Sequence, residues 1–177
     1  MKNKIIFIPG WMQTLGTYEK YEGLEIWKGK MDYKEKIDTE YVIGHSLGAN
    51  FVVLNQCENK NTKIILINPL LPRRNIFNWI WRYIKTRRKE GFYSGRKVVN
   101  DFKNNIAGFF KFMALVRSDL LKMMDEIPKD KIIILRGRND HFLCDEKTAD
   151  IIKSKGINMI EIDEVGHKWD KKFNEEI

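Results

Sequence analysis

Residues 41–50, which read YVIGHSLGAN, decide the fold of this chain. A short apolar run leads into Gly-x-Ser-x-Gly, and a helical pattern follows. The motif needs this order, because its serine sits on a sharp strand-to-helix turn where the two glycines let neighbouring backbone approach. The hydroxyl of Ser46 is then exposed at a helix N-terminus, which favours negative charge. The stretch predicts a nucleophile elbow, and the alternative is a glycine-rich turn whose serine only caps the helix.

Four more apolar runs of strand length lie at residues 5–8, 63–67, 131–135 and 158–162, and residues 24–27 form a weaker candidate. Continuous runs rich in β-branched residues are typical of strands that are buried on both faces, as in a parallel sheet. These runs and the one before Gly44 therefore predict a mostly parallel sheet.

Helical patterns at residues 47–57, 106–126 and 146–155 separate several of these strands. Alternation of strands and helices predicts a doubly wound α/β sheet, here of about six strands, whose ligands bind beyond the carboxyl ends of the strands. The length of 177 residues allows one well-buried core, so we expect one domain over residues 1–177.

The interval from residue 70 to residue 129 is longer than the usual connection between a strand and a helix. We expect a helical cap insertion at residues 70–105. Its large apolar residues are Phe77, Trp79, Ile80, Trp81, Tyr83, Phe92 and Tyr93. Its basic residues include Arg82, Lys85, Arg87, Arg88 and Lys89. The apolar residues could line a cleft or rest on an anionic membrane surface, or the apolar face could pack on the body while the basic face is solvated.

The charge and the cysteine content limit which other partners and which cellular compartment we expect. The formal net charge is +8, and much of the excess lies between residues 73 and 111, so it belongs to one segment. A basic segment without a sequence-reading module does not predict nucleic-acid binding. Cys57 and Cys144 lack the spacing of a disulfide framework, the apolar run at 5–8 is too short for a signal peptide, and no window resembles a membrane span. We expect a cytoplasmic protein.

A serine nucleophile needs a base, and the base needs an orienting carboxylate. Of the three histidines, His45 lies inside the elbow, where its side chain should point away from Ser46. His141 and His167 each follow a predicted strand. Asp140 follows the strand at residues 131–135, and its rivals as the acid are Asp145 and Asp163. A set made of Asp140, His141, Cys144 and Asp145 matches no zinc-site spacing, so we expect no metal.

On these motifs the chain resembles the α/β-hydrolase superfamily over nearly its whole length, as a compact serine hydrolase of esterase type. In that superfamily the triad comes in the order serine, acid, histidine, each on a loop after a strand. The resemblance implies that Ser46 is the nucleophile, Asp140 the acid and His167 the base. We expect no counterpart of the superfamily's usual leading hairpin, and we expect the first helix to be limited to residues 11–23.

The resemblance also implies an oxyanion hole made by main-chain N–H groups. Leu47 follows the nucleophile and supplies one donor, and Trp11 in the loop after the first strand supplies the other, with Met12 as the second choice. Pro9 stands where the superfamily commonly has a histidine. We expect Met12, Trp79 and Trp81 to contact the substrate.

The implied reaction is hydrolysis of a small carboxylic ester or thioester through an acyl-enzyme, without metal or organic cofactor. Esterases, thioesterases, lipases, peptidases and acyltransferases share these residues, so the substrate stays open, as does the oligomeric state. Two other classes of function also stay open. One is a non-catalytic binding protein on the same fold, and the other is a basic module that contacts a membrane surface or nucleic acid.

Overall fold

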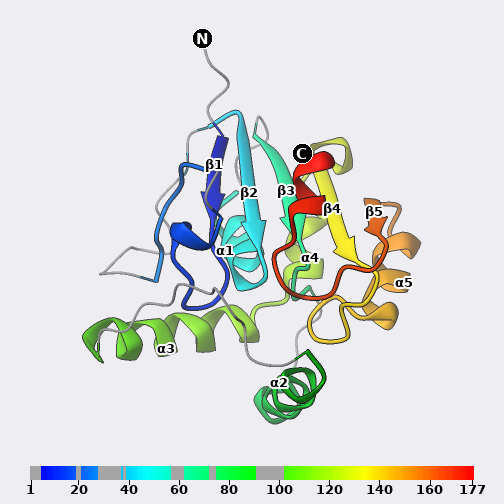
Figure 1. The fold of residues 1–177 in the computed structure, drawn as a ribbon. Coiled ribbons are helices and arrows are strands. Elements are labelled where there is room, and N and C mark those ends of the chain that lie inside the picture. The colour runs from blue at the N-terminus through cyan, green and yellow to red at the C-terminus, as the bar shows by residue number, and fades with distance from the viewer. Residues whose placement is uncertain are drawn as a thin grey trace.

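The computed structural model describes residues 5–18, 21–27, 37, 39–56, 62–71, 75–90 and 102–177. A five-stranded parallel sheet forms its centre, and the order of the strands in the sheet is their order in the chain (Figure 1). The strands are β1 (Ile5–Ile8), β2 (Tyr41–His45), β3 (Lys63–Ile67), β4 (Ile132–Gly137) and β5 (Asn158–Ile162). The prediction of a trimmed, parallel α/β sheet is confirmed.

The helices are α1 (Leu47–Gln56), α2 (Ile76–Glu90), α3 (Phe102–Arg117), α4 (Leu120–Met124) and α5 (Glu146–Ser154). Short 3₁₀ turns form η1 (Leu15–Thr17), η2 (Lys129–Lys131) and η3 (Lys171–Glu175). The helix expected at residues 106–126 is divided between α3 and α4, because the side chain of Asp119 caps a new helix by accepting from the Lys122 N–H. The weak strand candidate at residues 24–27 is not a strand, and only an isolated bridge joins Gly23 to Phe7.

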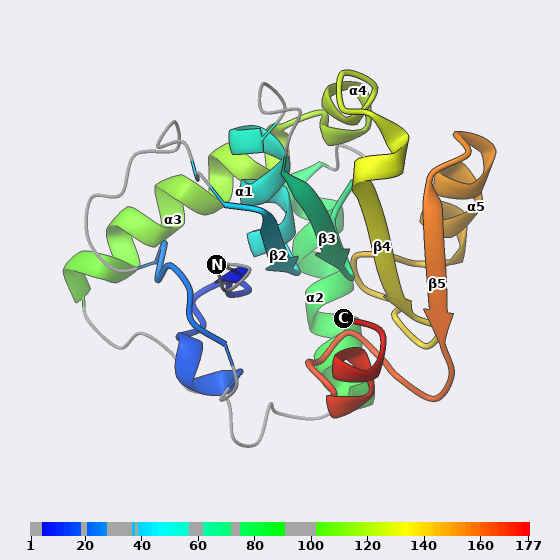
Figure 2. The ribbon, with the colours of Figure 1, turned by 90° about the horizontal axis from the view of Figure 1, so that it is seen from above.

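The two faces of the sheet are covered unequally. Figure 2 shows α1, α3, α4 and α5 on one side of the sheet and the turns η1 and η3 on the other. This follows from the strand order: when each strand lies beside its predecessor, right-handed crossovers carry every helix to the same face. In place of the second helical layer of a doubly wound sheet, the described residues have only 3₁₀ turns on this face.

The second face nevertheless has an apolar core of its own. Its buried members are Phe7, Tyr18, Ile43, Ile65, Ile67, Leu135, Val165 and Phe173. Phe173 in η3 is fully buried, and its ring stacks at 5.6 Å on Trp169. A few side chains from the two short turns therefore cover this face, as helices cover the first face.

The helices α2 and α3 lie beyond the carboxyl ends of the strands (Figure 1). Residues 72–74 and 91–101 of the expected cap, which include Phe92 and Tyr93, lie outside the described residues. The rings of Trp79 in α2 and Phe112 in α3 are 4.5 Å apart, so these two helices pack together at this end of the sheet. The boundaries of the cap stay a prediction. No helix in the described ranges has the length and apolar content needed to cross a bilayer.

Replacing Phe173 with alanine should lower the free energy of unfolding by about 3–5 kcal/mol, because the change empties part of the small second core. Urea unfolding followed by far-UV circular dichroism would measure the loss. Lys171→Ala in the same turn is the control, since Lys171 is exposed and should change stability by less than about 0.5 kcal/mol. Equal effects of the two substitutions would contradict the role given to Phe173.

Candidate active site

The turn between β2 and α1 is a tight elbow with Ser46 at its tip. Ser46 has a φ of 56°, which is unusual for a residue with a side chain, and its N–H donates to the carbonyl of Ile67 at 2.8 Å. A Cβ on Gly44 would lie 2.5 Å from the Cα of Ala49, and one on Gly48 would meet the carbonyl oxygens of Ile8 and Pro9. Only glycine fits at either position, which is why the sequence folds into this turn.

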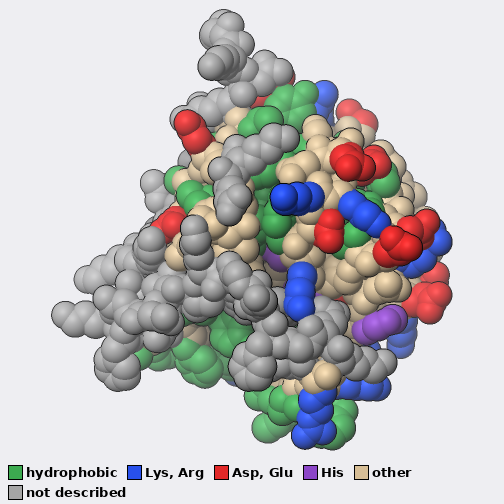
Figure 3. Space-filling model, viewed as in Figure 1, with side chains coloured by type: hydrophobic (Ala, Val, Ile, Leu, Met, Phe, Trp, Pro, Cys, Tyr) green, Lys and Arg blue, Asp and Glu red, His purple; other side chains and the backbone are tan. Residues whose placement is uncertain are grey.

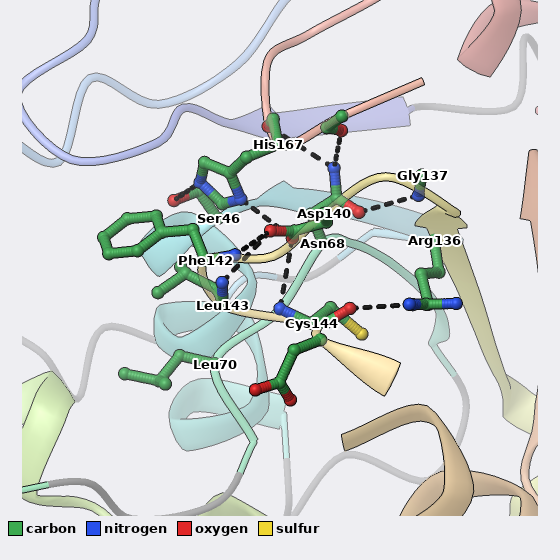
Figure 4. Close-up of polar contacts among 12 residues, drawn as sticks. Ser46, Asn68, Leu70, Arg136, Gly137, Asp140, Phe142, Leu143, Cys144 and His167 are labelled. Carbon is green, nitrogen blue, oxygen red and sulfur yellow. Dashed lines mark hydrogen bonds and ion pairs between the residues drawn. The ribbon is translucent and has the colours of Figure 1, made fainter. Parts of the chain in front are cut away.

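Three loops at the carboxyl edge of the sheet bring Ser46, His167 and Asp140 into one hydrogen-bonded line (Figure 4). The hydroxyl of Ser46 is 3.0 Å from Nε2 of His167, and Nδ1 of His167 is 2.9 Å from Oδ2 of Asp140. A carboxylate can only accept, so Nδ1 carries a proton and Nε2 is free to accept the proton of the serine hydroxyl. All three residues are buried. Such a line can transfer a proton away from the serine.

The carboxylate of Asp140 is completely buried and fully engaged. Oδ1 accepts the N–H groups of Phe142 at 2.7 Å and Leu143 at 3.1 Å, and Oδ2 accepts that of Cys144 at 3.1 Å. Burial by itself would raise the pKa of Asp140, but His167 and these N–H groups outweigh it, so the pKa lies below its usual value. Asp140 therefore stays ionised at neutral pH and can hold an imidazolium.

His45 and Asn68, which the sequence did not single out as partners of His167, bind the main-chain carbonyl of that residue. The carbonyl of His167 accepts from Nε2 of His45 at 3.1 Å and from Nδ2 of Asn68 at 3.3 Å. Nδ2 of Asn68 also donates to Gly166 at 2.9 Å, and its Oδ1 accepts the Gly137 N–H at 2.8 Å. Asn68 thus joins the ends of β3 and β4 to the histidine loop.

The sequence offers one signal for Asn68, which is a polar residue placed directly after a buried strand. In the structure Asn68 has a φ of 47°, a conformation that asparagine tolerates better than most residues. His45 is oriented by a second polar contact, because its Nδ1 lies 2.7 Å from the hydroxyl of Tyr18. The same hydroxyl accepts from the Gly10 N–H at 3.0 Å, so one phenol links the elbow to the loop after β1.

That loop forms a tight turn beside the nucleophile. The Gln13 N–H donates to the Gly10 carbonyl at 2.9 Å, and Met12 in the turn has a φ of 55°. Gly10 passes so close to the elbow that a Cβ there would lie 3.1 Å from that of Ser46. The expected oxyanion donors Trp11 and Leu47 consequently both border the cavity that contains Ser46.

The cavity that contains Ser46 has a volume of about 380 Å³, including its open mouth. Four aromatic side chains form most of its apolar wall: Trp11, Trp79, Tyr83 and Phe142. The rings of Trp79 and Tyr83 are parallel and 5.3 Å apart, and Trp11 meets Trp79 edge-on at 5.4 Å. Trp79 and Tyr83 of α2 thus form, together with Trp11 and Phe142, an aromatic roof over the cavity that contains Ser46.

Of the three residues expected to contact the substrate, only Trp79 lines this cavity. Trp81 is 66% exposed, because two residues along a helix turn the side chain by about 200° to the opposite side. The sulfur of Met12 is directed at Gly108 of α3 instead, where it would lie 2.6 Å from an added Cβ. The structure thus places Trp79, but neither Trp81 nor Met12, in the wall of this cavity.

The rival acids and base have other partners. Asp145 caps α5 by accepting the Thr148 N–H at 3.0 Å, and it pairs with Arg82 of α2. The exposed Asp163 pairs with Arg138 at 2.8 Å. His141 is exposed and borders a separate groove. Cys57 lies outside the described residues, and Cys144 is buried as a free thiol.

No protein-family model matches this chain, and no curated protein matches it in sequence. Solved structures match it in fold. A deformylase of Pseudomonas putida for N-formylmaleamic acid has a TM-score of 0.57 at 15% identity, covering 92% of this chain and 85% of that one. A structure from a study of carboxylesterases of Nitrososphaera gargenis has a TM-score of 0.54 at 10% identity, covering 92% and 82%. An α/β-hydrolase enzyme from a sediment metagenome has a TM-score of 0.50 at 17% identity, covering 92% and 81%. The fold is that of the α/β-hydrolases.

Asn68→Asp should slow the reaction of Ser46 with a fluorophosphonate probe by about 10- to 100-fold, because the side chain can no longer donate to the His167 loop. The added carboxylate should also favour the protonated imidazole and move the acid limb of the pH profile to higher pH. Labelling rates between pH 5 and pH 9 would measure both effects.

Asn55→Asp is the matched control for this experiment. Asn55 is also a buried asparagine that donates to a carbonyl, that of Phe51 at 2.9 Å, but it lies within α1. Its loss should lower stability without moving the pH profile. A profile that shifts equally in both variants would show that Asn68 has only a structural role.

Proposed function

We propose that this chain, which has the α/β-hydrolase fold, is a serine hydrolase that cleaves a carboxylic ester or thioester through an acyl-enzyme. The observation that carries the proposal is the line from Ser46 through His167 to the buried, ionised Asp140. The fold neighbours support it, since their descriptions name a deformylase, carboxylesterases and an α/β-hydrolase enzyme. The proposed substrate is a small molecule, and the proposed reaction uses no cofactor.

In the first half of the reaction, the Oγ of Ser46 attacks the carbonyl carbon while its proton passes to Nε2 of His167. Asp140 keeps the imidazole in the required tautomer and faces the positive charge that develops on it. The tetrahedral intermediate collapses when its bond to the leaving oxygen or sulfur breaks, and that atom takes the proton from Nε2. An alcohol or thiol departs, and an acyl ester remains on Ser46.

In the second half, water attacks the acyl-enzyme and gives a proton to Nε2 of His167, which then returns it to Ser46 as the carboxylic acid leaves. In both halves we assign the main-chain N–H groups of Leu47 and Trp11 to the oxyanion. Leu47 opens α1, where first-turn N–H groups have no acceptor within the helix. Trp11 lies in the turn after β1, which the hydrogen bond from the Gln13 N–H to the Gly10 carbonyl closes.

A non-catalytic binding protein on this fold is the main alternative. Two features favour the enzyme. The positive φ of Ser46 is strain that a simple helix cap does not need, since caps usually have extended dihedrals. A buried carboxylate is aligned through a buried histidine on that same serine, an arrangement that binding a ligand does not require.

The aromatic roof favours a short acyl group. The space beside Ser46 is narrow, and Trp79, Tyr83 and Phe142 bound it with rigid rings rather than flexible side chains. A long chain would have to displace packed rings. We therefore assign small acyl groups such as acetyl or propionyl to this site.

A fluorophosphonate probe tests the nucleophile and its acid. The wild-type protein should be labelled and Ser46→Ala should not, while Asp140→Asn should react about 10³- to 10⁴-fold more slowly because it no longer favours the required tautomer. Asp163→Asn is the control for the acid, since Asp163 pairs with Arg138 at the surface and should leave the rate unchanged. Absence of labelling of the folded wild type would remove the proposal.

A panel of p-nitrophenyl esters from acetate to octanoate tests the acyl pocket. The wild type should prefer the shortest esters, and Trp79→Ala should raise kcat/KM for hexanoate relative to acetate by about tenfold or more, because the space vacated by the ring accepts methylene groups. Trp81→Ala is the matched control, since Trp81 is on the same helix but faces outward. A preference that is identical in all three proteins would place the acyl group elsewhere.

A further inference from the structure

Large apolar side chains are exposed at one end of the molecule. Within the part of the chain that the structure describes, the exposed large hydrophobic residues are all in α2 and α3. They are Phe77, Ile80, Trp81 and Ile84 of α2, and Ile106, Phe109 and Phe110 of α3. Phe77 is 76% exposed, Phe110 67% and Trp81 66%. Soluble proteins rarely gather such residues on one surface unless that surface binds something.

These side chains are not part of the aromatic roof. The inner side of α2 packs on the body through Trp79 and Tyr83, whose rings contact Trp11 and Phe142. Phe77, Trp81 and Ile84 are spaced by four and three residues and form an outward stripe on the same helix. The inner apolar side of α2 is thus buried against the body. Packing within the described residues does not account for the outer apolar side, which is exposed.

The two exposed stripes lie at the same end of the molecule. Both helices lie beyond the carboxyl edge of the sheet in Figure 1, and Figure 3 shows hydrophobic side chains gathered along that end. We call the outward residues of α2 and α3 given above the outer apolar face. Its α2 residues lie on the side of that helix that faces away from the cavity that contains Ser46, whereas Trp79 and Tyr83 line the cavity.

The two helices that carry this face have an excess of basic residues. The sequences of α2 and α3 contain eight basic residues, five in α2 and three in α3, and a single acidic residue, Glu90. Of the eight, Lys111 is buried and Arg82 pairs with Asp145. Lys85 and Arg88 are exposed beside the apolar stripe of α2, and Lys and Arg side chains border the hydrophobic atoms at the foot of Figure 3. Apolar side chains surrounded by positive charge are the combination that binds an anionic bilayer surface.

A second copy of the chain fits this face less well. Pairing two outer apolar faces would bring cationic helices against cationic helices, and like charges in contact disfavour association. A bilayer that contains anionic lipids supplies the opposite charge and an apolar layer for Phe77 and Trp81 at once. Tryptophan and phenylalanine are also common on the apolar face of helices that lie in a bilayer interface.

We propose that the outer apolar face of α2 and α3 binds the surface of a membrane that contains anionic lipids. Phe77 and Trp81 enter the interface, and Lys85 and Arg88 lie at the level of the headgroups. The proposal concerns where the protein is held and goes beyond its proposed hydrolase activity, since binding by this face does not require Ser46 to react.

The test uses the Ser46→Ala protein, so that lipid hydrolysis cannot alter the vesicles. Sedimentation with vesicles of phosphatidylcholine and about 30% phosphatidylglycerol should pull the protein down, and vesicles of phosphatidylcholine alone should bind it several-fold less. Adding Phe77→Ser and Trp81→Ser should reduce the partition coefficient for the anionic vesicles by about tenfold or more. Far-UV circular dichroism would check that this variant is folded.

Charge reversal provides the second arm and its control. Arg88→Glu should weaken binding to anionic vesicles several-fold, because it places a negative charge beside the headgroups. Lys63→Glu makes the same change at the start of β3, the edge of the sheet opposite the cap, and should leave binding unchanged. Equal losses in both variants would mean that only net charge attracts the protein, and the proposal would be wrong.

Two further results would also overturn the proposal. One is no binding to either vesicle by the folded protein. The other is a dimer in solution that dissociates on Phe77→Ser and Trp81→Ser without any vesicle binding, which would give the face to a second copy. Neither result bears on the hydrolase assignment, because fluorophosphonate labelling of the wild-type protein tests that assignment without lipid.

Discussion

The buried carboxylate of Asp140 is the interaction on which the rest of the site depends. A carboxylate without access to water is very unfavourable unless it is paired, and here three main-chain N–H groups and His167 surround it. To supply those N–H groups, the chain after β4 must curl tightly around the side chain. That curl fixes the carboxylate, which fixes the tautomer of His167 and hence the direction of its hydrogen bond to Ser46. Removing the charge of Asp140 would therefore loosen the loop after β4 and weaken the hydrogen bonds that connect Asp140 through His167 to Ser46.

The positions of these groups depend on a five-stranded sheet whose two faces are covered unequally. The strands that deliver Ser46, Asp140 and His167 remain, and so do the close approaches of Gly44 and Gly48. Among the described residues, one face is covered only by η1 and η3, which close a small core around Phe7 and Phe173. That core also supports the loop that carries His167, because Val165 and Trp169 on either side of the histidine pack into it.

Local patterns in the sequence predicted much of this arrangement. Apolar runs located all five strands, and the glycine spacing identified the elbow, because both features depend on neighbours in the chain. The order of triad residues suggested Asp140 and His167, which the structure brings to Ser46. By contrast, the links from His45 and Asn68 to the carbonyl of His167 join residues far apart in sequence, and no local pattern encodes them. The sequence also did not predict which side of α2 packs on the body. That helix is apolar on two sides, and only packing determines that Trp79 faces inward and Trp81 outward.

The strand order has a consequence for how the chain can fold during synthesis. Each strand pairs with the one made just before it, so the sheet can grow from one edge as the polypeptide leaves the ribosome, and its pairings keep contact order low for a parallel sheet. Ser46 directly follows the second of these strands, whereas His167 follows the fifth. The hydrogen bond between Ser46 and His167 can therefore form only after all five of these strands have been synthesised.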